Sequence, residues 1–270
     1  MSDGDEIKAN AASEPLHGGE DMHIHRPKPL HGVREILTEI GVIVLGIALA
    51  LGGEQVVERL HRSEEARLAE RAMRLELAED DGQQAFARVV IAHCFESRIA
   101  LIHDGAFAAP ADQLRKWAAS YVPPFRSWDS EAWKAVVSSD IGNFMGAERL
   151  VDWSAAYRTV PGLSETNAHE SELAAELRDA LPPSGEPSAA DRQNLKRLAG
   201  LLRLANDRMS RGSELFLART RSLDATVPVT TQQTLLSQAR ALYGDCVVAP
   251  NLRAPPAAGD PTANLRGFVH

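Results

Sequence analysis

The chain has 270 residues, enough for one or two domains, and 44% of them are hydrophobic and 24% charged. This composition is typical of a globular protein and excludes a disordered or collagen-like chain. A net charge of −8 excludes a generally basic nucleic-acid binder, so we expect no nucleic-acid partner. Two cysteines are too few for a disulfide-rich scaffold or a zinc finger.

Residues 1–33 are polar and predict a disordered amino-terminal tail. His23, His25 and His31 lie beside basic residues, with His17 upstream, and histidine-rich tracts can bind metal. The tail has no cysteine and no predicted structure to hold acidic ligands with the histidines, so we expect no metal site and no cofactor. A solvated basic tail beside the membrane is the favoured interpretation.

Residues 40–53 read IGVIVLGIALALGG, without a charged or polar side chain, and would span roughly 21 Å as a helix. Extension to 36–57 gives roughly 33 Å, enough to cross the ~30 Å hydrocarbon core with acidic residues at both ends. A cleaved signal peptide and a soluble core helix are the alternatives. No small-residue cleavage site follows the run, and its glycines would weaken a helix in water. We therefore predict an uncleaved transmembrane anchor at 34–57.

The anchor and its flanks resemble the start of a group of uncharacterised single-pass membrane proteins of Gram-negative bacteria. That group has a basic lead with His and Pro, an E-I-x-V-I-V-x-G apolar run and then a charged helix. The residues that carry the resemblance are MHIHRPKPLHGVRE (22–35), EIGVIVLGIALAL (39–51) and EQ (54–55). The resemblance covers 22–80 well and the rest loosely. It implies an inner-membrane anchor and a periplasmic helical domain, and it implies no activity. Because the matching pattern begins at Met22, translation from Met1 or from Met22 stays open.

The flanking charges do not decide the orientation of the anchor. Three basic residues precede it and five follow it, which disfavours a cytoplasmic amino terminus: Arg26, Lys28 and Arg34, then Arg59, Arg62, Arg67, Arg71 and Arg74. The charge rule applies to short loops, however, and long domains translocate largely regardless of it. The domain after the anchor is long, so the charge count has little weight here, and the resemblance implies an amino terminus in the cytoplasm.

The rest of the chain predicts an all-α protein, in which the anchor continues into a juxtamembrane helix and an irregular helical bundle follows. Charged i,i+4 pairs and apolar residues at helical spacing continue the helix to about Asp81, and Gly82 is a weak point. Further helices are expected at 85–102, 111–121, 130–137, 145–157, 164–181, 189–223 and 231–243. The domain covers 58–248, with a Pro- and Gly-rich linker at 182–187 and a disordered tail at 249–270. Ser188 and Asp191 form a predicted capping box after the linker.

Cys94 and Cys246 lie near the two ends of the predicted domain. A disulfide between them would close a loop of 152 residues and would persist only in an oxidising compartment. The alternative is two independent buried thiols. The resembling group also has paired cysteines at similar places. We favour the disulfide, which would place the domain outside the cytoplasm.

The chain concentrates its aromatic residues between 117 and 157, including all four tryptophans. Such a cluster can mark a ligand cleft or a partner surface, or it can be the core of an Ala-rich bundle. The core interpretation is favoured, with Trp128 as the ring most exposed to solvent. The candidate ligand or partner residues are Trp117, Tyr121, Trp128, Trp133, Trp153 and Tyr157.

Gly46, Ala50 and Gly53 share one face of the predicted anchor. Small residues at this spacing allow two membrane helices to approach closely, although they can equally face lipid. The pattern leaves a homodimer through the anchor as one hypothesis for a partner, alongside the lipid bilayer itself.

Catalytic motifs are absent from the sequence, including G-x-S-x-G, G-x-x-x-x-G-K-[ST], G-x-G-x-x-G and H-E-x-x-H. An enzyme is therefore the least favoured class, and no catalytic residue is predicted. The leading hypothesis is a membrane-anchored helical interaction or scaffold protein with an unidentified protein partner. The alternative is a periplasmic ligand-binding or sensory bundle that uses the aromatic region 117–157.

Overall fold

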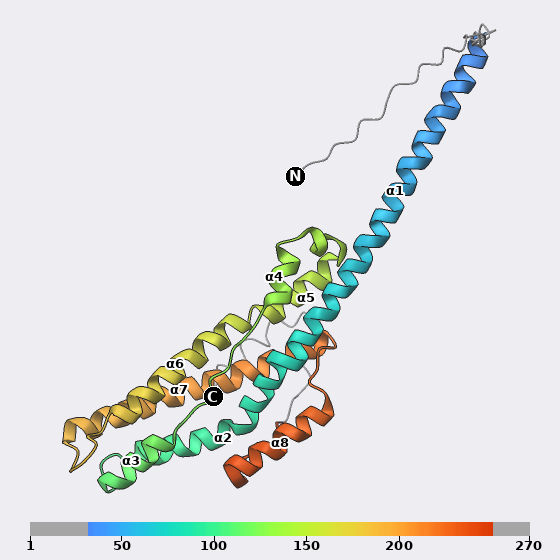
Figure 1. Ribbon diagram of the computed structural model, residues 1–270. Coiled ribbons are helices and arrows are strands. Elements are labelled where there is room, and N and C mark those ends of the chain that lie inside the picture. The colour runs from blue at the N-terminus through green and yellow to red at the C-terminus, as the bar shows by residue number, and fades with distance from the viewer. Residues whose placement is uncertain (1–31, 251–270) are drawn as a thin grey trace, which may run out of the picture. The chain divides into compact units, whose positions relative to one another are not determined.

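The structure is a computed structural model that describes residues 32–250. The predictions for the amino-terminal tail, its histidines, the start site and residues 251–270 lie outside the described residues. Every regular element from residue 32 to residue 250 is a helix, which confirms the predicted all-α class (Figure 1). The chain divides into two units, Met1–Gln55 and Val56–His270, which are described separately below.

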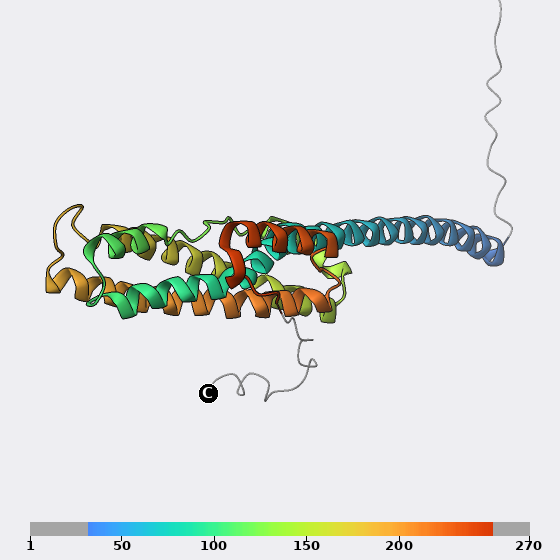
Figure 2. The ribbon, with the colours of Figure 1, turned by 90° about the horizontal axis from the view of Figure 1, so that it is seen from below.

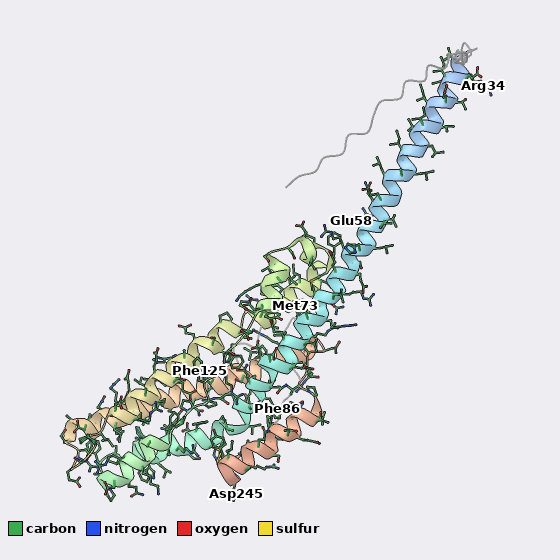
Figure 3. The ribbon with its side chains drawn as sticks, in the orientation of Figure 1. Arg34, Glu58, Met73, Phe86, Phe125 and Asp245 are labelled. Atoms are coloured by element: carbon green, nitrogen blue, oxygen red, sulfur yellow. A yellow bond between two sulfur atoms is a disulfide. The ribbon has the colours of Figure 1, made fainter. Side chains whose placement is uncertain are left out.

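Helix α1 (Val33–Leu75) contains the whole apolar run and the charged segment that follows it. No proline interrupts this range, and the Leu, Ile and Ala residues of the run favour a helix in the absence of water. All side chains from 33 to 55 are exposed. Figure 3 shows the side chains between Arg34 and Glu58 pointing outward around the helix. The first unit is therefore a helix whose apolar surface has no protein cover of its own.

The charged part of α1 belongs to the second unit and is stabilised along its own surface. Arg62 pairs with Glu58 at 2.8 Å and Arg74 pairs with Glu70 at 3.4 Å, as the i,i+4 spacing predicts. Met73 on the same helix is fully buried. This segment thus has one face in solvent and another in the core of the unit.

A π-helix, η1 (Glu76–Asp80), connects α1 to α2 (Asp81–Gly105). The sequence predicts a weak point at Gly82. The chain stays helical there, and the change from α- to π-helix lies directly before it. A Cβ atom at Gly82 would lie 2.5 Å from the carbonyl oxygen of Leu77 and 3.1 Å from Val227. Glycine therefore permits the close approach of the wide π turn to the following helix.

Helices α2, α6 (Val160–Asp179) and α7 (Ala189–Ser222) form the centre of the second unit, with α7 in contact with both of the others (Figure 2). Helix α3 (Ala111–Ser120) packs on α2 and α6, and α8 (Val229–Tyr243) packs on α2. The core is mainly aliphatic and includes Phe86, which is labelled in Figure 3. Four shorter elements complete the unit: α4 (Glu131–Val137), η2 (Asp140–Phe144), α5 (Ala147–Tyr157) and η3 (Gly244–Cys246).

A local sequence signal identifies the start of α7. The predicted capping box is confirmed, since the Ser188 hydroxyl accepts from the Asp191 N–H and the Asp191 carboxylate accepts from the Ser188 N–H. Helix α6, by contrast, begins at Val160 and includes Pro161, which the sequence analysis places before the helix. Proline is tolerated in the first helical turn, where its missing N–H has no partner to lose.

Candidate functional site

The apolar helix is the first candidate site. It is the one helix in residues 32–250 that is long and apolar enough to cross a membrane, with a mean hydropathy of 2.2 in its most apolar window. Leu45 and Ile47 have exposed fractions of 59% and 55%. Nothing lies within 4 Å of a Cβ atom built at Gly46 or Gly53. No other part of the unit therefore covers the predicted small-residue face. That this face forms a dimer contact remains a prediction.

Cys94 and Cys246 form a disulfide with an S–S distance of 2.05 Å, as predicted. The bond joins α2 to the short turn after α8. Around it, the Val248 N–H donates to the Val90 carbonyl, and the Arg98 guanidinium lies 5.2 Å from the centre of the Tyr243 ring. The disulfide therefore reinforces the packing of α8 and the chain that follows it on α2.

A buried polar cluster, defined here as Arg88, Glu170, Tyr121 and Asn206, lies between the central helices. Arg88 Nη2 donates to Glu170 Oε1 at 2.7 Å and to Asn206 Oδ1 at 2.8 Å. The Tyr121 hydroxyl donates to the same Glu170 oxygen at 2.8 Å. Arg88 and Glu170 are almost completely buried, so an ion pair that is shielded from water joins α2 to α6.

Burial determines the electrostatics of this cluster. Desolvation, followed by the negative charge of Glu170, raises the pKa of Tyr121 above its usual range. The guanidinium of Arg88 also lies 5.1 Å from the centre of the Phe95 ring. Tyr121 therefore stays a hydroxyl donor, and the cluster is a neutral, hydrogen-bonded link between helices.

The six aromatic candidates are spread through the packing of the second unit. Tyr121, Trp153 and Tyr157 are buried, whereas Trp117, Trp128 and Trp133 are half-buried. Trp133 stacks on Tyr157 with 5.5 Å between ring centres, and Trp128 meets Phe216 edge-on at 6.3 Å. The exposure expected at Trp128 is found instead at Phe125, whose exposed fraction is 73%.

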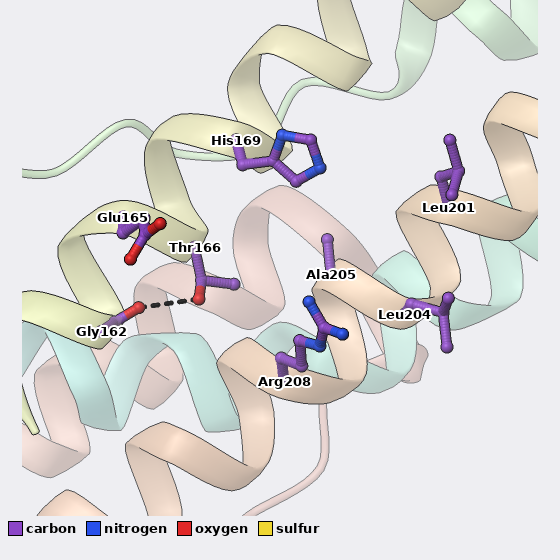
Figure 4. A pocket seen from close by; sticks show the side chains of 8 residues that line it. All are labelled: Gly162, Glu165, Thr166, His169, Leu201, Leu204, Ala205 and Arg208. Carbon is purple, nitrogen blue, oxygen red and sulfur yellow. Dashed lines mark hydrogen bonds between the residues drawn. The ribbon is translucent and has the colours of Figure 1, made fainter.

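A pocket of about 360 Å³ lies elsewhere, between α6 and α7 (Figure 4). Glu165 and His169 of α6 face Arg208 of α7 across it, above an apolar floor that includes Ala205. Arg208 and Glu165 make no ion pair within residues 32–250. The pocket offers charges of both signs beside apolar walls, and the sequence gives no signal for it.

Sequence reasoning also missed the buried charges Arg88, Glu170 and Asp81. A partial signal exists for Arg88, which shares one face of the helix with the apolar residues Ala85, Ile91 and Phe95. No local signal identifies its partner, because Glu170 lies 82 positions away.

Within the described residues, no group of three or more His, Cys, Asp or Glu side chains is arranged to hold a metal ion. A comparison with known protein families, curated proteins and solved structures found no match to this chain. The functional assignment therefore depends on the physical features described above.

Proposed function

We propose that this chain is a single-pass inner-membrane protein that holds a helical interaction or scaffold unit in the periplasm. The observation that carries the proposal is the exposed apolar helix. Transfer of one large aliphatic side chain out of water contributes about 1.5–3 kcal/mol, and more than ten such side chains are exposed in α1. A bilayer supplies the apolar environment that the first unit lacks. The mechanism would be tethering, in which the anchor concentrates a binding surface near the membrane.

The disulfide supports the periplasmic part of this proposal. Such bonds persist in oxidising compartments and are rare in the cytosol, so the Cys94–Cys246 pair supports a domain outside the cytoplasm. The resemblance of residues 22–80 to a group of bacterial single-pass membrane proteins supports the same topology, and we propose membership of that group. The amino terminus would then be cytoplasmic.

Membrane insertion can be tested by introducing charge into the apolar run. We expect the native chain to stay in the membrane pellet after alkaline carbonate extraction. The double variant Leu45→Arg/Ile47→Arg should move to the supernatant, because each arginine near the centre of a span costs about 3 kcal/mol. Leu60→Arg is a matched control on the same helix and should stay in the pellet. Release of the native chain by carbonate would overturn the anchor.

Topology needs a separate measurement. A reporter that is active only in the periplasm should be active when fused after the helical unit, and a reporter that folds only in the cytoplasm should be inactive there. The opposite pattern would reverse the orientation while leaving the membrane anchor intact.

A homodimer through the anchor is a further part of this proposal. Gly46→Leu would separate two helices that meet on the small-residue face, so crosslinking of the chain in membranes should fall. Gly41→Leu lies on another face of the helix and should leave crosslinking unchanged. Equal crosslinking in both variants would exclude this contact.

The α6–α7 pocket supports a second candidate function, a ligand-binding bundle. Its charges of both signs and its apolar walls fit a small zwitterionic ligand with an apolar part, such as an aliphatic amino acid. An increase in thermal stability with such compounds, abolished by Arg208→Ala, would support this function. This pocket lies outside the aromatic region from which the sequence predicts a ligand site.

A further inference from the structure

The π-helix η1 places two carboxylates against one stretch of backbone. Side chains five positions apart diverge on an α-helix, whereas an i→i+5 turn brings them to nearly the same side. Glu76 and Asp81 have this spacing. Asp81 Oδ1 accepts from the Asp129 N–H at 3.1 Å, and Glu76 Oε2 accepts from the Ala132 N–H at 2.9 Å. Two acidic side chains thus bind the chain where it enters α4.

The stretch 127–133 depends on these contacts for its position. It covers the end of the segment without regular structure between α3 and α4 and the first turn of α4. Besides the two carboxylates, its polar anchor to α2 is the Gln84 side chain, which donates to the Ser127 carbonyl at 2.6 Å. The bound stretch keeps the Trp128 ring against Phe216 and the Trp133 ring against Tyr157.

Each carboxylate also has an oxygen that lacks a partner. Asp81 is completely buried, and its Oδ2 atom has no hydrogen-bond partner among the described residues. The Oε1 atom of Glu76 is also buried without a partner in hydrogen-bond geometry, and the Tyr157 hydroxyl is the side-chain group that interacts with this carboxylate. Neither side chain forms an ion pair with any residue between 32 and 250, in contrast to Glu170, which has Arg88. Two unpaired buried negative charges would be costly, and one bound proton removes much of that cost.

The charges that act on Asp81 are those of Glu76 and Asp80 on η1 and of Asp129 on the facing stretch. Burial raises the pKa of Asp81 to about 7, these three carboxylates add to the increase, and the Asp129 N–H opposes it.

Groups on the other packed elements give Asp81 no compensating cation in contact. Tyr157 on α5 stays neutral because burial, together with Glu76, raises its pKa above the usual range. Lys134 on α4 lies within the field of Glu76 but pairs with Glu131. From α7, Arg219 donates to the Ala155 carbonyl.

We propose that Glu76 and Asp81 form a proton-dependent latch that holds residues 127–133 on the π-helix. With Asp81 protonated, both side chains keep their backbone contacts. Loss of that proton leaves two adjacent buried negative charges, and water reaches them when the stretch moves away. Opening exposes the half-buried rings of Trp128 and Trp133, so the latch controls access to an aromatic surface. The latch lies within residues 76–157 and does not depend on the membrane anchor.

The test uses the full chain in detergent micelles, with tryptophan fluorescence and hydrogen exchange of residues 121–137 followed from about pH 5 to about pH 9. Exchange is corrected for the pH dependence of the intrinsic rate. We expect acrylamide quenching and corrected exchange of this segment to rise at least about twofold across a transition near pH 7.

Asp81→Asn is the decisive variant, because its amide oxygen still accepts from Asp129 while its charge is lost. The transition should disappear, with the segment protected throughout. Asp80→Asn is the matched control on an exposed neighbour. It should retain the transition, displaced to slightly lower pH because the negative charge of Asp80 no longer raises the pKa of Asp81.

Glu76→Gln provides a second variant if Asp81→Asn does not fold. Without the neighbouring negative charge, the pKa of Asp81 is less elevated, so the transition should move to lower pH. A native chain with equal protection at both ends of the pH range would overturn the latch. A transition that persists unchanged in Asp81→Asn would also overturn it.

Discussion

Arg88 and Glu170 meet as a buried ion pair between α2 and α6, whereas Glu76 and Asp81 lie at the π-helix without a cation in contact. Both clusters fix chain segments that are distant in sequence. In the first cluster, the positive charge of Arg88 compensates the negative charge of Glu170. In the second, backbone N–H groups donate to one oxygen of Asp81 and one oxygen of Glu76. Because burial raises the pKa of Asp81 to about 7, the second cluster should respond to pH near neutrality.

The largest expected effect comes from removing one partner of the ion pair. Arg88→Met leaves Glu170 buried and uncompensated, and should lower the free energy of unfolding by about 3–5 kcal/mol, measured by denaturant titration of the full chain in micelles. The double variant Arg88→Met/Glu170→Met should recover much of this loss. A loss of less than about 1 kcal/mol in the single variant would show that the pair carries little of the stability.

The second largest loss of stability is expected from removing the disulfide beside this cluster. Cys94 precedes Phe95, the ring under Arg88, and the bond closes a loop of 152 residues. Cys94→Ser should lower the free energy of unfolding under oxidising conditions by about 2–4 kcal/mol. Cys246→Ser should cost the same, and the double variant should cost no more than either. Additive losses would mean that the thiols act independently.

The carboxylate pair predicts a pH dependence with a definite sign. The folded protein raises the pKa of Asp81 from 3.8 to about 7, so it binds more protons than the unfolded chain between these values. This contribution to stability is complete below about pH 4 and is lost as the pH rises through about 7.

Asp81→Asn should therefore gain stability relative to the native chain as the pH rises, with the smallest difference below about pH 4 and the largest above about pH 7. The measurement is the melting temperature of both proteins across this range. A constant difference at all pH values would contradict a titration of Asp81.

The smallest effect is expected at Tyr121, whose hydroxyl is one of two donors to the same Glu170 oxygen. Tyr121→Phe keeps the ring packed against Phe95 and removes one hydrogen bond to a charged acceptor, at a cost of about 1–2 kcal/mol. In an Arg88→Met background the same change should cost a different amount, because the two donors share an acceptor. Equal costs in both backgrounds would show that the donors are uncoupled.

Much of the secondary structure was accessible from sequence because its causes are local. The capping box at Ser188, the i,i+4 charge pairs of α1 and the apolar spacing of α7 each act within one or two helical turns. In the sequence, Gly82 indicates a weak point in the helix. In the structure, its missing side chain permits the close contact with the Leu77 carbonyl at the π turn.

The candidate sites were harder to anticipate because they join residues from distant parts of the chain. The role of Arg88 depends on its hydrogen bonds to Glu170 and Asn206. The role of Asp81 depends on the nearby Glu76 and on the hydrogen bond from the Asp129 N–H. A one-dimensional pattern records neither burial nor the partner across a helix interface. The aromatic enrichment at 117–157 was visible in the sequence, but only the packing shows that Tyr121 and Trp153 are internal while Phe125 is exposed.

By itself, the sequence determined the helical class, the apolar run and the presence of two cysteines, because composition and periodicity carry this information. The tertiary structure decided that Cys94 meets Cys246, that Arg88 is neutralised by Glu170, and that Asp81 is buried with no cation in contact. The physical reason is that hydrophobic periodicity acts over a few residues. The free energy of a buried charge depends instead on every group that folding brings within a few ångströms of it.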